Sequence, residues 1–113
     1  MKESSHYIMP MNRIEALQQI LAQNPANPLA RYGLAMEHVN AGEYEAAVGE
    51  FRTLIDGDPG YTYAYFHAAQ TLEKMGRIEE AKELYRRGIE AAGRKADAHA
   101  RDKLQAALDS LES

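Results

Sequence analysis

The chain has 113 residues, of which 45% are hydrophobic and 27% are charged, and its formal net charge is −4. This composition fits one soluble globular domain, and the mild acidity argues against a nucleic-acid surface, which needs clustered positive charge. The absence of cysteine excludes a disulfide framework and a thiolate zinc site. No apolar run reaches the roughly 18 residues of a membrane helix, and residues 1–10 lack the apolar core of a secretory signal. We therefore expect a cytoplasmic protein that contacts neither membrane nor nucleic acid.

The chain is predicted to begin with a flexible tail and a first helix. Residues 1–10 show no helical periodicity, which indicates the tail. The helix is expected over about residues 12–23, with Asn12 as its cap and Glu15 as the capping-box partner. Asn24-Pro25 ends it. Its apolar residues recur on one face, at Ile14, Leu17, Ile20 and Leu21.

Two helices joined by a short turn are predicted next, over about residues 28–41 and 43–56. Asn27-Pro28 opens the first helix, since asparagine is a good cap and proline suits the first helical position. Gly42 can adopt the left-handed conformation that ends a helix. The breaker Gly57-Asp58-Pro59-Gly60 follows the second helix. The apolar set of that helix is Tyr44, Ala47, Val48, Phe51, Leu54 and Ile55.

The fourth helix is predicted over about residues 61–75, although its beginning alternates as a strand would. Tyr61, Tyr63 and Tyr65 stand at every second position. An offset of 34 residues makes this segment equivalent to residues 28–41. We predict a helix because such a long-range pattern outweighs local propensity.

Two more helices are predicted to complete the chain, over about residues 77–92 and 95–111. Gly76 precedes the first of them, and Gly93 is predicted to end it. The last helix has a narrow apolar face, made of Leu104, Ala107, Leu108 and Leu111. A terminal helix needs only one such face, because no further helix covers the other. We therefore predict that it caps the array.

The offset of 34 residues relates turn, small and aromatic positions to one another. The matched pairs are Gly42 with Gly76, Tyr44 with Ile78, Ala47 with Ala81, and Phe51 with Tyr85. A fixed offset held by several kinds of residue indicates a repeat. Ala47 and Ala81 are predicted to lie where the two helices of each pair cross, because small residues let helix axes approach. Phe51 and Tyr85 are expected to fill the gap against the next unit.

This spacing resembles the tetratricopeptide repeat over about residues 11–111. Each unit carries part of the family pattern, at Leu34, Ala35, His38, Ala47, Phe51, Leu54 and Pro59 in the first and at Tyr65, Ala68, Ala69, Leu72, Ala81, Tyr85 and Gly88 in the second. Arg31 departs from it at a bulky aromatic position, and Gly93 departs at the closing proline. The resemblance covers nearly the whole chain and rests on two copies in phase.

The resemblance implies an all-α, right-handed superhelical array of antiparallel helix pairs, with about six helices in one domain over residues 11–113. The expected divisions are a half unit at 11–27, full units at 28–61 and 62–95, and a C-terminal capping helix at 95–111.

The resemblance also implies a protein-binding scaffold that has no catalytic activity. In the family, the first helix of each unit lines a concave groove. The corresponding faces here carry Leu29, Tyr32, Met36, Val39, Tyr63, Phe66 and Gln70. We predict an adaptor that binds a peptide or helix of another protein in this apolar groove. Two alternatives remain open. In the first, the groove binds a second copy of the chain, which would make the chain a self-assembly (homo-oligomerisation) module. In the second, flanking helices cover these residues, which are then part of the core.

One specificity known among relatives is not expected here. Some of them hold an acidic C-terminal peptide with a clamp of lysine and asparagine. Tyr32 and Met36, with Gly33 beside them, stand at the corresponding positions. The clamp is therefore absent from this sequence.

No catalytic, cofactor or metal set is predicted. His6, His38, His67 and His99 are scattered, without the i, i+4 spacing of two metal ligands on one helix face. We expect His38 to be packed with its ring bonded locally. The sequence has no glycine-rich phosphate loop, nucleophile elbow or His-Glu metal motif, so we expect no enzyme activity.

Basic residues gather between residues 77 and 95, at Arg77, Lys82, Arg86, Arg87, Arg94 and Lys95. Acidic residues are interleaved with them, and the pairs Glu83–Arg87 and Arg86–Glu90 have i, i+4 spacing. We therefore predict a solvent-exposed, salt-bridged helix face and not a nucleic-acid site.

Overall fold

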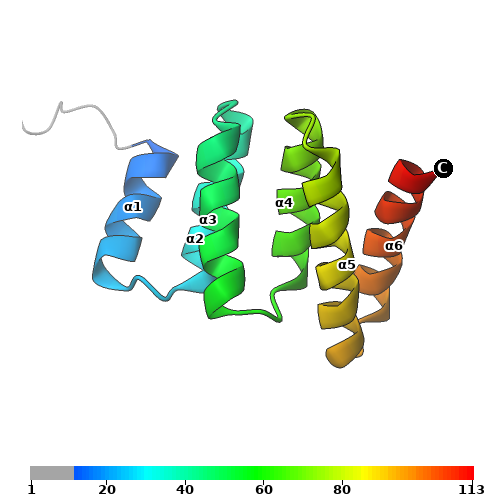
Figure 1. Ribbon diagram of the computed structural model, residues 1–113. Helices are drawn as coiled ribbons and strands as arrows, with labels where there is room; N and C mark the ends of the chain where they lie inside the picture. Colours follow the sequence, from blue (N-terminus) through cyan, green and yellow to red (C-terminus); the bar gives the residue numbers. More distant parts are fainter. Residues whose placement is uncertain (1–11) are drawn as a thin grey trace, which may run out of the picture.

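The computed structural model describes residues 12–113, so the tail predicted at residues 1–10 lies outside the described residues. The described part forms six α-helices, and they are α1 (Arg13–Gln23), α2 (Pro28–Asn40), α3 (Tyr44–Gly57), α4 (Thr62–Lys74), α5 (Ile78–Arg94) and α6 (Ala98–Glu112). Figure 1 shows the pair α2–α3 beside the pair α4–α5, with α1 and α6 at the two outer ends. This confirms the predicted all-α array of antiparallel helix pairs.

Each helix packs mainly on its neighbours along the chain. The helices of each pair contact one another, α3 also contacts α4, and α6 contacts both α5 and α4. Helix pairs that contact only the units beside them are typical of a repeat array. Within residues 12–113, no helix is both long enough and apolar enough to cross a membrane.

The predicted caps of α1 and α2 are confirmed. Asn12 Oδ1 accepts a hydrogen bond from the Glu15 N–H at 2.8 Å, and Glu15 Oε1 accepts one from the Asn12 N–H at 3.2 Å. Asn27 Oδ1 accepts from the Ala30 N–H at 3.0 Å. These bonds satisfy N–H groups that the first helical turn leaves without a backbone partner.

The turns inside the two helix pairs are also confirmed. Gly42 and Gly76 have φ values of 76° and 78°. The N–H of the following residue bonds back to the last turn of the helix, from Glu43 to the His38 carbonyl at 2.8 Å and from Arg77 to the Leu72 carbonyl at 2.9 Å. Glycine is favoured at this position because it has no Cβ to clash in the left-handed conformation.

The prediction that Gly93 ends α5 is wrong. The helix continues to Arg94, and α6 begins only at Ala98 instead of residue 95. One unit earlier, Pro59 stands at the equivalent position, and α3 ends before it because proline cannot continue a helix. Gly93 keeps its N–H, so the helix can continue through it. The left-handed residue of this turn is Ala96, with φ of 56°.

Replacing Ala96 with glycine should stabilise the protein. Ala96 is exposed and occupies the same kind of turn as Gly42 and Gly76, so the change removes only the Cβ that strains the left-handed backbone. We expect the free energy of unfolding to rise by about 1 kcal/mol. Urea denaturation measures this directly, and an unchanged or lower midpoint would contradict the turn described here.

One large apolar core runs from α2 to α6. Ala47, Ala81, Phe51 and Tyr85 all have an exposed fraction of 0%, which agrees with their predicted inward positions. The Phe51 ring lies 6.5 Å from the ring of His67, so it reaches the next unit as expected. A smaller cluster joins α1 to α2, and its buried members are Leu21, Ala30 and Leu34.

The last helix buries only the face predicted for it. Leu104 and Leu108 are buried, while Ala107 and Leu111 are partly buried against the core. Ala100, which the sequence did not indicate, is also buried. The other positions of α6 are exposed. This arrangement fits a helix at the end of an array.

Candidate partner-binding face

The seven residues predicted for the groove differ in exposure. Phe66 is buried, with an exposed fraction of 8%, whereas Leu29 is 70% exposed and belongs to neither apolar cluster. Gln70 is exposed as well. The remaining four are partly buried and pack against the large core, and they are Tyr32, Met36, Val39 and Tyr63. These four and Gln70 form what we call the α2–α4 face.

Phe66 is held among other side chains. Its ring lies 5.2 Å from His67 and 6.1 Å from Tyr85, measured between centroids. The Lys103 Nζ, from α6, lies 4.8 Å from the centre of the Phe66 ring. We therefore leave Phe66 out of the accessible face.

Tyr32 lies at the centre of an aromatic cluster that joins α2, α3 and α4. Its ring is 5.2 Å from Tyr61, 5.7 Å from His67 and 6.2 Å from Phe51. His67 was not among the residues predicted for the groove. Its spacing could have indicated it, because a residue four positions after Tyr63 lies on the same helix face.

A cavity of about 340 Å³ opens at one end of the α2–α4 face. Three tyrosines and three charged residues line it together with Thr62, and they are Tyr32, Tyr61, Tyr63, Asp58, Lys95 and Asp97. The volume falls at the lower end of the range of small-molecule pockets. Two of these residues, Tyr32 and Tyr63, were predicted from the sequence as binding residues.

Tyr32 and Tyr61 of this cavity stay protonated at neutral pH, because the pKa of each is raised. Burial raises the pKa of Tyr32, and the neighbouring Tyr61 and Tyr63 raise it further. The pKa of Tyr61 is raised by burial and then by the Asp58 carboxylate. Both hydroxyls therefore remain neutral hydrogen-bonding groups.

His67 is neutral at pH 7. Burial lowers its pKa below 6.5, the hydrogen bond to Gln70 opposes this shift, and the positive charge of Lys103 adds to the lowering. A histidine in this state contributes an uncharged ring to the aromatic cluster.

This depressed pKa predicts a loss of stability in acid. The unfolded chain takes up a proton on His67 as the pH falls through about 6.5, whereas the folded protein takes it up only at lower pH. Stability should therefore decrease below pH 6.5. His67→Gln should flatten this part of the curve of stability against pH, measured by urea denaturation. His99→Gln, on the exposed side of α6, should leave the shape of the curve unchanged. An identical curve for His67→Gln and the unchanged chain would contradict the burial of His67.

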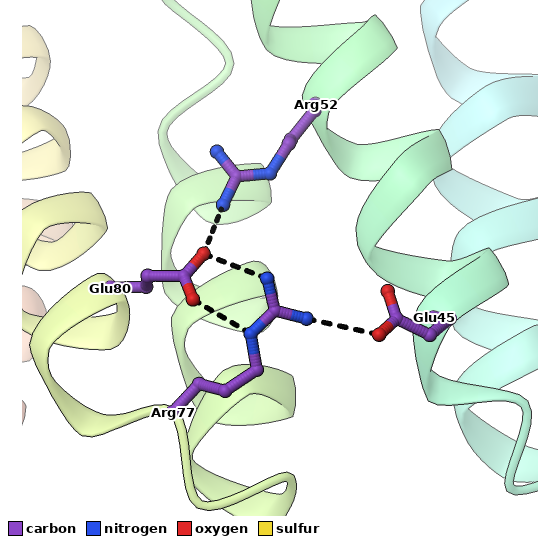
Figure 2. Close-up of polar contacts among 4 residues, drawn as sticks. All are labelled: Glu45, Arg52, Arg77 and Glu80. Carbon is purple, nitrogen blue, oxygen red and sulfur yellow. Dashed lines mark hydrogen bonds and ion pairs between the residues drawn. The ribbon is translucent and has the colours of Figure 1, made fainter.

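A network of ion pairs links α3 to α5 (Figure 2). Arg77 contacts both oxygens of Glu80, at 2.7 and 2.8 Å, and reaches Glu45 at 3.1 Å. Arg52 contacts Glu80 at 3.3 Å. The hydrogen bond from Arg77 is the main cause that lowers the pKa of Glu80. The basic residue Arg77 is thus paired with carboxylates, as predicted for this helix face.

The two predicted i, i+4 pairs of α5 do not form. Arg86 instead contacts Glu112 of α6 at 2.8 Å. The Arg87 guanidinium lies over the ring of Tyr65, 5.7 Å from its centre. Both arginines therefore contact partners on other helices instead of Glu83 and Glu90.

His38 has the local bond expected for it. Its Nδ1 lies 2.7 Å from Glu43 Oε1, across the turn between α2 and α3. The ring is partly buried. This contact gives His38 a structural role in that turn.

Together these features define an array of repeated helix pairs, with an accessible face on the first helix of each pair. Two family models described as tetratricopeptide repeat match residues 38–108 and 10–64. The chain belongs to the tetratricopeptide repeat family, whose members are generally modules of protein–protein interaction.

Individual relatives agree with this assignment. A TPR repeat-containing protein of Pseudomonas aeruginosa is 25% identical over 99 residues, which cover 88% of this chain and 94% of that protein. The solution structure of a tetratricopeptide repeat domain protein from Salinibacter ruber is 31% identical, with a TM-score of 0.75, and the match covers 79% of this chain and 90% of that one. The type III secretion translocator chaperone of Yersinia enterocolitica has the same fold, with a TM-score of 0.80 at 18% identity, over 88% of this chain and 76% of its own.

Proposed function

We propose that the chain is a non-catalytic adaptor that binds a peptide or helix of another protein across the α2–α4 face. One observation carries the proposal. Tyr32 of α2 and Tyr63 of α4, from the first helices of consecutive units, line one cavity and both remain partly exposed. Tyrosines of this kind are frequent anchors at protein interfaces, since they bury a large ring and keep a polar tip.

The rest of the face supports an extended contact. Met36 and Val39 lie one and two turns beyond Tyr32 along α2 and are partly buried. Methionine suits such a surface because its flexible, polarizable side chain adapts to the partner. Gln70 offers amide groups for hydrogen bonds to a peptide backbone.

A matched pair of tyrosine variants tests the proposal. Peptides are first selected against the chain from a displayed random library. Tyr63→Ala should then weaken their binding at least about tenfold, because loss of an interface anchor costs more than about 1.4 kcal/mol. Tyr44→Ala removes a tyrosine of similar exposure from α3, outside the α2–α4 face, and should leave the affinity unchanged. Equal affinities for the two variants, both still folded by circular dichroism, would overturn the proposed face.

Self-assembly is the competing outcome of the same experiment. Light scattering over a range of concentrations should give the mass of a monomer for the unchanged chain. A mass that rises with concentration and returns to that of a monomer in Tyr63→Ala would assign the face to a second copy of the chain.

A further inference from the structure

We propose that the cavity at the end of the α2–α4 face binds a cationic side chain, arginine or lysine, of the partner peptide. This inference rests on the proposed function, because it names the chemistry of the partner at that face. It is carried by three observations: the tyrosine walls of the cavity, the balance of its charges, and its size.

The walls are aromatic. The rings of Tyr32 and Tyr61 lie 5.2 Å apart with an angle of 33° between their planes, and Tyr63 lines the same space. Cations are attracted to the faces of such rings when they lie within about 6 Å of the centre. The aliphatic stem of arginine or lysine can also pack along a ring while its charged end stays near polar groups.

The charges of the lining favour a cation. Asp58 and Asp97 supply two carboxylates against the single ammonium of Lys95, which leaves one net negative charge. Lys95 Nζ donates to the carbonyl oxygen of Gly60 at 2.9 Å. Asp97 Oδ1 accepts from the Ala100 N–H at 3.1 Å, so this carboxylate is held at the start of α6 where it lines the cavity. An anionic side chain would meet both carboxylates, so it is disfavoured.

The size and the neutral hydroxyl groups suit one side chain. About 340 Å³ accommodates a guanidinium or ammonium with its stem. The hydroxyls of Tyr32 and Tyr61 can accept hydrogen bonds from such a group, which has donors only. A partner that crosses the α2–α4 face would thus place a basic residue beside Tyr61 and its apolar residues along Met36 and Val39.

N-acetylarginine amide is the first probe, and N-acetylcitrulline amide is its neutral control of nearly the same shape. The ring signals of the tyrosines are followed by NMR during each titration. We expect saturable shifts of Tyr32, Tyr61 and Tyr63 with the arginine probe and no saturable shifts with citrulline. Asp58→Asn should weaken the arginine probe about fivefold. Asp56→Asn, an exposed aspartate of α3 outside the cavity lining, should leave its affinity unchanged.

Equal binding of arginine and citrulline, or tighter binding of N-acetylglutamate amide, would overturn the inference. Peptides selected against the chain give a second readout that does not depend on the weak affinity of a single residue. If they bind the α2–α4 face and none needs a basic residue, the inference fails and the proposed function stands. If the arginine probe binds in the cavity but no peptide is selected, the proposed function fails and the cavity keeps its cation specificity.

Discussion

Phe66→Ala should destabilise the protein by about 3–5 kcal/mol, which is a large part of the stability of a small domain. The ring is 8% exposed and packs against His67 and Tyr85, so its removal leaves a cavity in the core. Tyr63→Ala, one turn earlier on α4 at a partly exposed position, should have a much smaller effect. Urea denaturation followed by circular dichroism measures both.

The result also separates two interpretations of α4. The sequence predicted Phe66 as a groove residue, and an open groove residue supports no core. A denaturation midpoint that Phe66→Ala leaves unchanged would support the prediction that Phe66 belongs to the binding face. A loss of stability larger than that of Tyr63→Ala would assign it to the core.

Gly88→Ala should destabilise the protein although alanine is the better helix former. A Cβ atom at Gly88 would lie 2.7 Å from Tyr65 Cβ and 3.0 Å from Leu104 Cδ2. These atoms belong to α4 and α6, so α5 passes close to both of its neighbours at this point. Overpacking of a well-filled site costs about 1–3 kcal/mol.

Gly49→Ala is the matched control, and its effect should have the opposite sign. Gly49 lies inside α3, is exposed, and a Cβ built there meets no atom within 4 Å. The change should stabilise the helix by about 0.5–1 kcal/mol, the usual gain from alanine over glycine. Two glycine variants that shift the denaturation midpoint in the same direction would contradict the close packing around Gly88.

Much of the fold could be predicted because local chemistry and the repeat agreed. Asn12, Asn27, Gly42 and Gly76 each ended or began a helix as expected, since caps and left-handed turns depend on a few adjacent residues. The boundary between α5 and α6 could not be predicted in this way. Gly93 offers no proline to end the helix, and the left-handed turn falls on Ala96, a residue that disfavours this conformation.

The site was harder to predict than the fold. Periodicity placed Tyr32 and Tyr63 on helix faces that line one cavity. Periodicity could not decide which of the adjacent residues Phe66 and His67 is exposed, because consecutive helical residues differ by only about 100° around the axis. The packing of α6 decides which of the two side chains is covered. Asp58, Lys95 and Asp97 were missed because they lie in turns that are far apart in sequence and meet only in the folded chain.

The most direct test of the binding face is a map of amide shifts when a selected peptide is added to the protein labelled with ¹⁵N. Binding across the α2–α4 face predicts that the largest shifts fall in residues 29–39 and 61–73. The largest shifts in α3 and α5, the second helices of the two pairs, would contradict it, as would a library that yields no peptide.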